Sequence, residues 1–346
     1  MTNLPARLRR RVWRDPDVLI AALLFVCMYS VLALLSPSQL STYSTNNFLV
    51  LICTLGVAAA GTTLVLLTGG FDLSVAGTIG LANVLAATLM PQHPDQVWGI
   101  AIVIVAIGLV VGVVNGFFVA VMGLQSIAVT LSTYIVLSGV ALVILPTAGG
   151  SVPASFGDPL TIQAGFVSPA LLVLLGVVGL WLIFSRTRTG IGASAIGADV
   201  VAARMSGIPV RRVQVTCYGL AGALYACAGL YYSAVTASGD PRAGQPFLLT
   251  AFAAAALGFV SFRGGSGSVI ATLFGAATLT VIPKLLFATG VADFWTGAFE
   301  GAVILLALTI PRAGLLLTRV LRKHPTPLGN YTSDSVSRTI DAAVRK

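Results

Sequence analysis

The chain has 346 residues, of which 57% are hydrophobic and only 9% are charged, and its formal net charge is +9. A soluble domain carries about 25% charged residues, so the composition excludes a soluble enzyme, and the high hydrophobicity excludes a chain that is disordered throughout. A transmembrane β-barrel is disfavoured because its strands alternate in polarity, whereas the apolar runs here are continuous. The composition predicts an all-α polytopic membrane protein.

Ten apolar runs approach the length of about 20 residues that crosses a bilayer as a helix. They are 18–35, 47–67, 72–90, 97–121, 127–145, 167–185, 213–235, 248–262, 268–287 and 294–310. The first run follows five arginines, as in a signal peptide, but its length and the lack of a small-residue cleavage site predict an uncleaved helix. The run at 248–262 is short and alanine-rich.

The positive charges predict the orientation of these helices. Ten spans place 18 of the 20 basic residues on one side of the membrane, and only Arg242 and Lys284 lie elsewhere. Cytoplasmic loops carry the excess of Lys and Arg, so both termini are expected in the cytoplasm. The expected parts are a basic segment 1–16, a membrane domain 17–311 with a cytoplasmic loop 186–212, and a disordered cytoplasmic tail 312–346.

A polar break separates the second and third runs at Thr68–Ser74. Gly69 and Gly70 interrupt the helix, and Asp72 is expected to cap the next one. One interpretation is a cytoplasmic hairpin with a capped helix; the other is a broken helix beside a transport pathway, where unwound backbone lines a cavity.

Glycines at helical spacing follow in the fourth run. Gly108, Gly112 and Gly116 share one helix face, as do Gly297 and Gly301 in the last run. Small residues at this spacing let helices approach closely in lipid, which favours packing within the chain over a dimer seam. Asn115 is either a hydrogen-bonding residue between helices or a pathway residue.

The charged loop 186–212 contains a short helix signal. Asp199 is a good cap for a helix over 200–206, Gly207 suits the position just past its end, and Pro209 prevents its continuation. A two-turn helix is unstable alone in water, so it either packs on this chain's own helix ends or docks into a groove of a cytoplasmic partner. The second option would explain how a chain without an ATP site is driven.

A second glycine-rich hairpin spans residues 263–269. Its sequence GGSGSVIAT resembles GGFDLSVAGT of the first break, which suggests a distant internal repeat. It lacks the lysine of a phosphate-binding loop, and no Ser/His/Asp set or paired carboxylates lie at membrane depth. The four cysteines lie in apolar runs, and the two histidines lie far from other ligands, so no metal centre is expected. The basic termini are explained by the orientation of the protein in the membrane, so nucleic-acid binding is not expected.

Four stretches together resemble the membrane permease of bacterial sugar ABC importers. They are TGGFDLSVAG (68–77), GVVNGFFVAVMGLQSIAVTLST (112–133), AIGADVVAARMSGIPVRRV (195–213) and RGGSGSVIATLFGA (263–276). The family takes up ribose, xylose, galactose or galactofuranose and is distantly related to branched-chain amino-acid permeases. The resemblance covers roughly residues 15–310.

The resemblance implies three partners besides the lipid bilayer of a bacterial cytoplasmic (inner) membrane. They are a second permease chain, identical or a sister, an ABC ATPase that carries ATP and magnesium, and a periplasmic or extracellular sugar-binding protein. This chain itself needs no cofactor. The implied coupling residues are Gly197, Asp199, Ala202, Ala203, Arg204, Ser206, Gly207 and Ile208. Asp199 replaces the family's usual asparagine, which is an equivalent cap.

The predicted function is therefore a permease subunit that is not itself an enzyme. Its expected substrate pathway comprises Thr68, Gly69, Gly70, Asp72, Ser74, Asn115, Thr130 and Thr133. An ion-coupled secondary carrier is the first alternative, disfavoured because such carriers need intramembrane acids and only Glu300 lies well inside a span. An intramembrane enzyme is the second, and it lacks a nucleophile–base pair.

Departures from the family pattern affect the expected substrate more than the transport role. Leu248 and Thr250 stand where relatives often carry acidic residues, and Lys284 stands where they often carry amides. Because a lone charge inside a membrane is costly, Lys284 and Glu300 are hypothesised to pair. The sequence does not identify the sugar.

Overall fold

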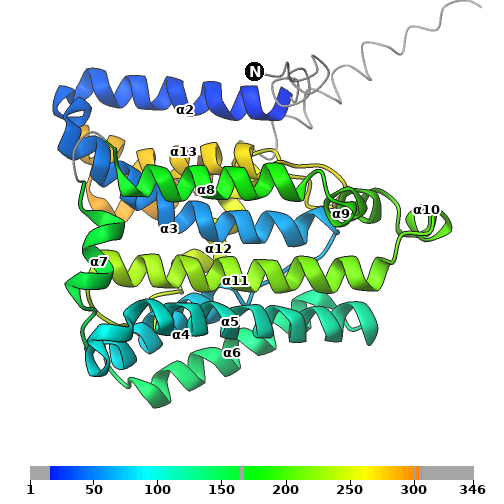
Figure 1. Ribbon diagram of the computed structural model, residues 1–346. Coiled ribbons are helices and arrows are strands. Elements are labelled where there is room, and N and C mark those ends of the chain that lie inside the picture. The colour runs from blue at the N-terminus through cyan, green and yellow to red at the C-terminus, as the bar shows by residue number, and fades with distance from the viewer. Residues whose placement is uncertain (1–15, 164–166, 300, 304, 306–346) are drawn as a thin grey trace, which may run out of the picture. The chain divides into compact units, whose positions relative to one another are not determined.

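The computed structural model describes residues 16–163, 167–299, 301–303 and 305 (Figure 1). In these residues the regular elements are helices, joined by one isolated antiparallel bridge between Gly149 and Gly239. This confirms the all-α prediction. The chain divides into residues 1–304 and 305–346, and the helices below belong to the first part. The predicted boundary at residue 311 lies outside the described residues.

The helices fall into long and short sets. The longer ones are α2 (Pro16–Leu35), α3 (Thr42–Leu67), α4 (Val75–Leu89), α5 (Val97–Gly116), α6 (Ser126–Ile144), α8 (Pro169–Phe184), α11 (Val210–Thr236) and α13 (Val269–Ala288). The shorter ones are α7 (Ala154–Thr161), α9 (Arg188–Ala198), α10 (Val200–Met205) and α12 (Phe247–Leu257). Single turns are η1 (Pro37–Leu40), η2 (Met90–Gln92), η3 (Pro94–Gln96), the π-helical η4 (Phe117–Val121) and η5 (Asp293–Trp295).

Seven helices of the described residues are long and apolar enough to cross a membrane. They are Pro16–Leu35, Thr42–Leu67, Val75–Gln92, Pro94–Val121, Ser126–Ile144, Val210–Thr236 and Val269–Ala288. Each coincides with a predicted run. The bent pair α8 and α9, which turns by 77° at its break, would make an eighth. The chain is thus a multi-pass membrane protein, with seven or eight candidate spans among the described residues, and the ten predicted spans are not confirmed.

The remaining predicted runs differ from the structure for local reasons. The run at 248–262 forms only the 11 residues of α12, which ends where Phe259 turns to a φ of +57°. Of the run at 294–310, residues 300, 304 and 306–310 lie outside the described residues, and its described part is helical from residue 296. Helix α7 was not predicted, because its eight residues include Pro159 and Asp158 and resemble a loop.

Helix α11 lies at the centre and packs against α3, α4 and α5, while α13 packs on α2, α3 and α12. Glycines bring α11 and α5 together: a Cβ on Gly108 would overlap the carbonyl oxygen of Gly222, and one on Gly112 that of Tyr218. This confirms packing within the chain. At Gly297 and Gly301 an added Cβ meets nothing within 4 Å among the described residues, so the expected close packing is not seen in this part of the structure.

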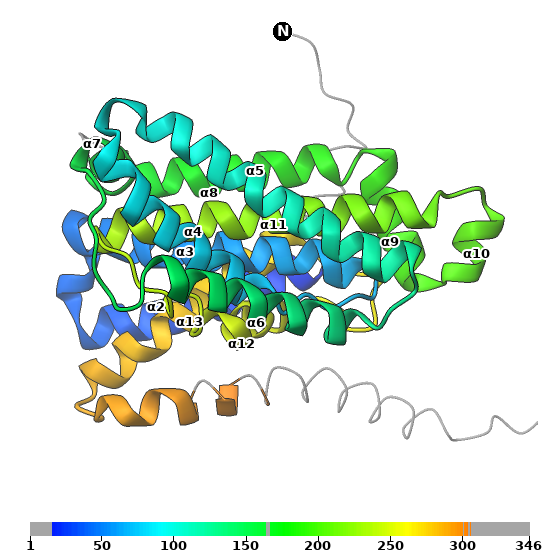
Figure 2. The same cartoon turned by 90° about the horizontal axis from the view of Figure 1, so that it is seen from below.

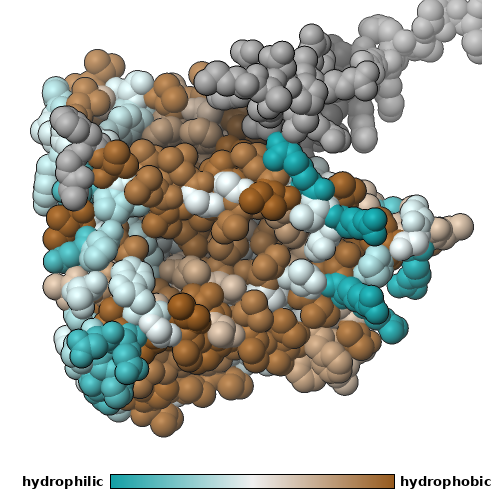
Figure 3. All heavy atoms as spheres, in the orientation of Figure 1, coloured by the Kyte–Doolittle hydropathy of each residue, from teal (hydrophilic) through white to brown (hydrophobic). Residues whose placement is uncertain are grey.

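The sides of the bundle expose apolar side chains, whereas its two ends are more hydrophilic. Figure 3 shows hydrophobic residues over the middle of one face and hydrophilic ones toward the ends, as a bilayer requires. Helices α9 and α10 lie at one end, beside the carboxyl end of α3, and α7 lies at the other (Figures 1 and 2). We call these the α10 end and the α7 end.

Candidate functional site

Helix α10 is a single short helix with a complete cap at each end. Asp199 Oδ1 accepts hydrogen bonds from the amides of Val201 (2.8 Å) and Ala202 (3.0 Å). Past the other end, Gly207 has a φ of +78° and its amide donates to Arg204 O, while the amide of Ile208 donates to Ala203 O. This is a Schellman motif, which favours glycine because of the positive φ. The predicted helix and both caps are confirmed.

One face of α10 is buried and the other is open. Ala203 is 4% exposed and packs with Ile196, Val210 and Val213. The side chains of Val201 and Met205 are 67% and 86% exposed. Among the other residues expected to couple, Asp199, Ala202, Arg204, Ser206 and Gly207 are exposed, and Gly197 and Ile208 are half-buried. The bundle anchors α10 through Ala203 and leaves an apolar face uncovered by the described residues.

Helix α9 was missed by the sequence analysis, because its glycines at 190, 192 and 197 disfavour a helix interior. Thr187 caps it by accepting a hydrogen bond from the amide of Gly190 at 3.1 Å. A Cβ on Gly190 would overlap the carbonyl oxygen of Phe184. Glycine is therefore required there for the sharp turn from α8, and tertiary packing overrides the low helix propensity of the glycines in α9.

The break between α3 and α4 is a buried polar turn. Thr68 ends α3, with its hydroxyl donating to Val65 O at 2.8 Å, and Gly69 follows with a φ of +78°. The hydroxyl of Tyr218, on α11, donates to Phe71 O at 3.1 Å. The amide of Leu73 donates to Thr130 Oγ1 on α6 at 3.0 Å. Neighbouring helices thus satisfy the unwound backbone, as a break inside a membrane requires.

Four side chains after this break form a hydrogen-bonded chain that we call the Asp72 cluster. Thr133 Oγ1 donates to Asn115 Oδ1 at 2.6 Å, and Asn115 Nδ2 donates to Ser74 Oγ at 3.0 Å. The Ser74 hydroxyl donates to Asp72 Oδ1 at 2.6 Å. The cluster joins α6, α5 and the start of α4. Asn115 therefore bonds between helices, which was one of its two interpretations.

Asp72 does not cap α4 in the way expected. Its Oδ1 accepts from the amide and hydroxyl of Ser74, and Ser74 itself occupies the position before the helix. The helix begins at Val75, later than predicted. Asp72 is 0% exposed, and its Oδ2 has no hydrogen-bond partner among the described residues.

The eight residues expected along a pathway lie together at the α10 half of the bundle. Thr68, Gly70, Asp72, Ser74, Asn115 and Thr130 are buried, Thr133 is half-buried and Gly69 is exposed. Thr130 connects to the rest by accepting from the Leu73 amide. In this conformation the buried polar side chains among them form a packed core between helices.

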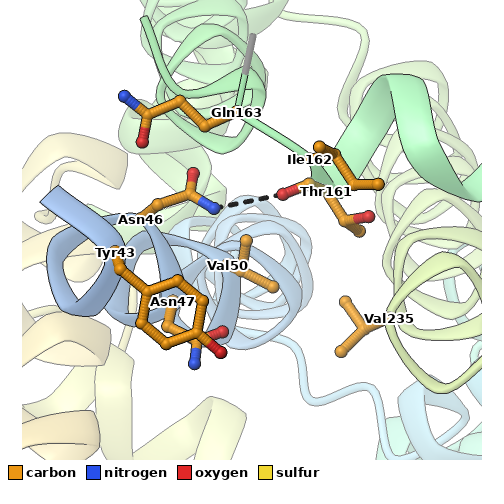
Figure 4. Close-up of a pocket in the computed structure, with 8 residues that line it drawn as sticks. All are labelled: Tyr43, Asn46, Asn47, Val50, Thr161, Ile162, Gln163 and Val235. Carbon is orange, nitrogen blue, oxygen red and sulfur yellow. Dashed lines mark hydrogen bonds between the residues drawn. The ribbon is translucent and has the colours of Figure 1, made fainter. Parts of the chain in front are cut away.

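A pocket at the α7 end was not predicted (Figure 4). Its volume is about 370 Å³, and its lining residues are Tyr43, Asn46, Asn47, Val50, Thr161, Ile162, Gln163 and Val235. We call it the Asn46 pocket. Asn46 is held by two hydrogen bonds, donating to Thr161 O at 3.1 Å and accepting from Ser168 Oγ at 2.6 Å. All eight lining residues are uncharged. The adjacent amides at 46 and 47, opening an apolar run, were the available sequence signal.

Lys284 contacts a neutral partner. Its Nζ donates to Gln39 Oε1 at 3.3 Å and lies 5.8 Å from the centre of the Phe48 ring. Glu300, the other half of the hypothesised pair, lies outside the described residues. An amide and an aromatic face stabilise the ammonium group here.

Comparison with known proteins gives consistent matches. Residues 44–308 match the family described as branched-chain amino acid transport system, permease component. The chain is 34% identical to the ribose import permease protein RbsC of Bacillus subtilis, with 82% of this chain and 88% of that protein covered. It is 31% identical to the galactose/methyl galactoside import permease protein MglC of Escherichia coli, with 85% and 92% covered. A probable ABC transporter permease of Sinorhizobium fredii is 33% identical over 74% of this chain and 77% of its own length. No solved structure matches the chain.

Proposed function

The chain belongs to the family of branched-chain amino acid transport system permease components, and we propose that it carries a sugar or related small polar solute. As a permease subunit of an ABC importer it is a transport component and is not an enzyme. The family associates with an ATPase and a substrate-binding protein. The ribose and galactose permeases among its relatives support a sugar as the solute.

The assembly that we propose has two permease chains in a bacterial cytoplasmic membrane. The ATPase holds ATP and magnesium, and this chain holds no cofactor. Both termini lie in the cytoplasm, because this orientation gathers the basic residues on the cytoplasmic side. The α10 end then faces the ATPase and the α7 end faces the binding protein. The spans would number ten if α12 and the last run each contribute one.

The observation that carries the coupling proposal is the exposed apolar face of α10. Val201 and Met205 project from a helix that is capped at both ends and anchored through Ala203. Burying such side chains in a partner is favourable, at about 25 cal/mol per Å² of apolar area. A fixed helix with an open apolar face fits a groove in the ATPase, and ATP-driven movement of the ATPase would then displace α10.

The solute pathway that we propose runs along the Asp72 cluster and the adjacent break. Its side chains are hydroxyls, an amide and one carboxylate, which suit a hydroxyl-rich solute. Because these groups are packed together in this conformation, the path is open only when α4, α5 and α6 separate at the cluster. Alternating access therefore corresponds to breaking and re-forming the hydrogen bonds among Ser74, Asn115 and Thr133.

The Asn46 pocket is the entry site in this proposal. Its lining includes Thr161, the last residue of α7, and α7 lies at the end of the bundle opposite α10 (Figure 1). Its uncharged lining, with the exposed Asn47 and Tyr43, suits a neutral solute that offers hydroxyl groups and an apolar ring face. A charged substrate would find no opposite charge among the described lining residues.

Reconstitution tests the proposed function. The chain is incorporated into liposomes with its cognate ATPase and binding protein, and uptake of labelled ribose and galactose is measured with ATP. We expect accumulation that requires ATP, the ATPase and the binding protein. Accumulation against a gradient by this chain alone, driven by a proton or sodium gradient, would contradict it.

A further inference from the structure

Three segments that are distant in sequence meet backbone to backbone near the end of α3. The amide of Gly265 donates a hydrogen bond to Leu67 O at 3.0 Å. Gly197, in the last turn of α9, lies against both residues: a Cβ there would overlap Leu67 O and Gly265 N. Contacts this close leave no space for a side chain at residue 197.

Gly264 completes the contact. Its φ is +90°, and a Cβ built on it would lie 2.7 Å from Gly197 Cα and 2.7 Å from Gly69 N. The carboxyl end of α9, the turn after α3 and the hairpin before α13 therefore touch through main-chain atoms. We call the four residues Gly69, Gly197, Gly264 and Gly265 the glycine joint.

The joint lies between the proposed docking helix and the Asp72 cluster. Gly197 is two residues from Asp199, the cap of α10. On the other side, Gly69 opens the turn that leads to Asp72 and Ser74. Main-chain atoms in direct contact have no side-chain rotamers through which a displacement could be absorbed, and packed protein interiors are poorly compressible. A displacement of α10 is thereby passed to the start of α4.

We propose that the glycine joint is a rigid coupling element, with Gly197 as its positioning residue, which carries the movement of α10 to the Asp72 cluster. The three segments move as one body during transport. This inference rests on the proposed docking of the ATPase at α10. It assigns to Gly197 a role in coupling that is separate from binding the ATPase.

The first test is Gly197→Ala in the complete complex of permease, ATPase and binding protein. The added methyl group pushes the joint apart, so we expect at least a fivefold fall in solute moved per ATP hydrolysed, with ATPase binding retained. A merely structural defect lowers transport and hydrolysis together and leaves their ratio unchanged. The matched control is Gly176→Ala in α8, where an added Cβ meets nothing within 4 Å. An unchanged ratio in Gly197→Ala would overturn the proposal.

Spin labels provide a second test that does not depend on the first variant. Ala198, at the end of α9, and Ser266, in the hairpin before α13, are both exposed, so labels there leave the four glycines of the joint unchanged. Ala198→Cys with Ser266→Cys is made in a chain whose four native cysteines are replaced by alanine. If the joint is rigid, the distance between the two labels is the same before and after ATP binds to the complex.

The opposite results separate the two proposals. If the distance between the labels changes when ATP binds while transport continues, the segments move apart and the rigid joint is refuted, and the proposed function stands. If the unmodified chain neither binds the ATPase nor transports with it, the proposed function itself fails.

Discussion

The side-chain amide of Asn115 donates to Ser74 Oγ at 3.0 Å, and this bond ties the end of α5 to the first residue before α4. Both side chains are fully buried. The same amide accepts from Thr133 on α6, so one residue connects three helices. In the proposed mechanism this connection opens whenever the solute passes.

Replacing Asn115 by leucine should therefore destabilise the protein. The change removes the bonds of Asn115 to Ser74 and Thr133, whose hydroxyls keep Asp72 Oδ1 and Val129 O as acceptors. A buried hydrogen bond contributes about 0.5–1.5 kcal/mol, and two are lost. Thermal unfolding in detergent measures the loss. Thr88→Val is the control, because among the described residues the Thr88 hydroxyl bonds only to carbonyls of its own helix. Equal unfolding temperatures for the two variants would show that the hydrogen bonds of Asn115 do not stabilise the protein.

The two changes Asp72→Asn and Asp72→Ala should have different effects. Asparagine keeps an oxygen that accepts from Ser74 and removes a charge that pairs with no basic side chain in the described part of the chain. Burying an unpaired charge is costly, so Asp72→Asn should be at least as stable as the natural protein. Alanine removes the acceptor and should cost about 1–3 kcal/mol. Chemical unfolding distinguishes them, and equal losses would show that the carboxylate is paired.

The caps of α10 give a third prediction. Asp199→Ala removes an acceptor used by two amides, which should cost the helix about 1 kcal/mol and weaken binding of the ATPase. Asp199→Asn retains the cap and should bind normally. Co-purification of the ATPase measures both. If both variants lose binding, the negative charge of Asp199 is needed to bind the ATPase and the capping hydrogen bonds alone are not sufficient.

The Asn46 pocket predicts a change in apparent affinity. Asn47→Ala and Tyr43→Ala should raise the KM of uptake by about three- to tenfold, since a hydrogen bond contributes about 0.5–1.5 kcal/mol, with little effect on the maximal rate. Gln96→Ala, an exposed amide outside the pocket lining, is the control. If KM is unchanged in both pocket variants, the solute enters elsewhere.

The sequence predicted the parts of this molecule whose causes are local. Asp199, Gly207 and Pro209 define α10 within eleven residues, and the spacing of Gly108, Gly112 and Gly116 predicts close helix packing. The role of Asp72 was predicted wrongly. Its carboxylate accepts hydrogen bonds from Ser74, and Ser74 is the residue before α4. The sequence alone cannot distinguish this local bond from a helix cap. Helix α9 and the glycine joint depend on contacts between residues 67, 197 and 265, so the need for glycine there is visible only in the folded chain.

In the proposed mechanism, ATP-driven movement of the ATPase reaches this chain through contact with the exposed apolar face of α10. Val201→Asp together with Met205→Asp places charge on that face, and both side chains point away from the bundle. Ile191→Asp on α9 is the control, since Ile191 is 61% exposed and lies outside α10. Measured in liposomes with the ATPase and binding protein, ATP-dependent uptake and ATPase binding should both be lost in the double variant and retained in the control. Unchanged binding and uptake in the double variant would contradict the account.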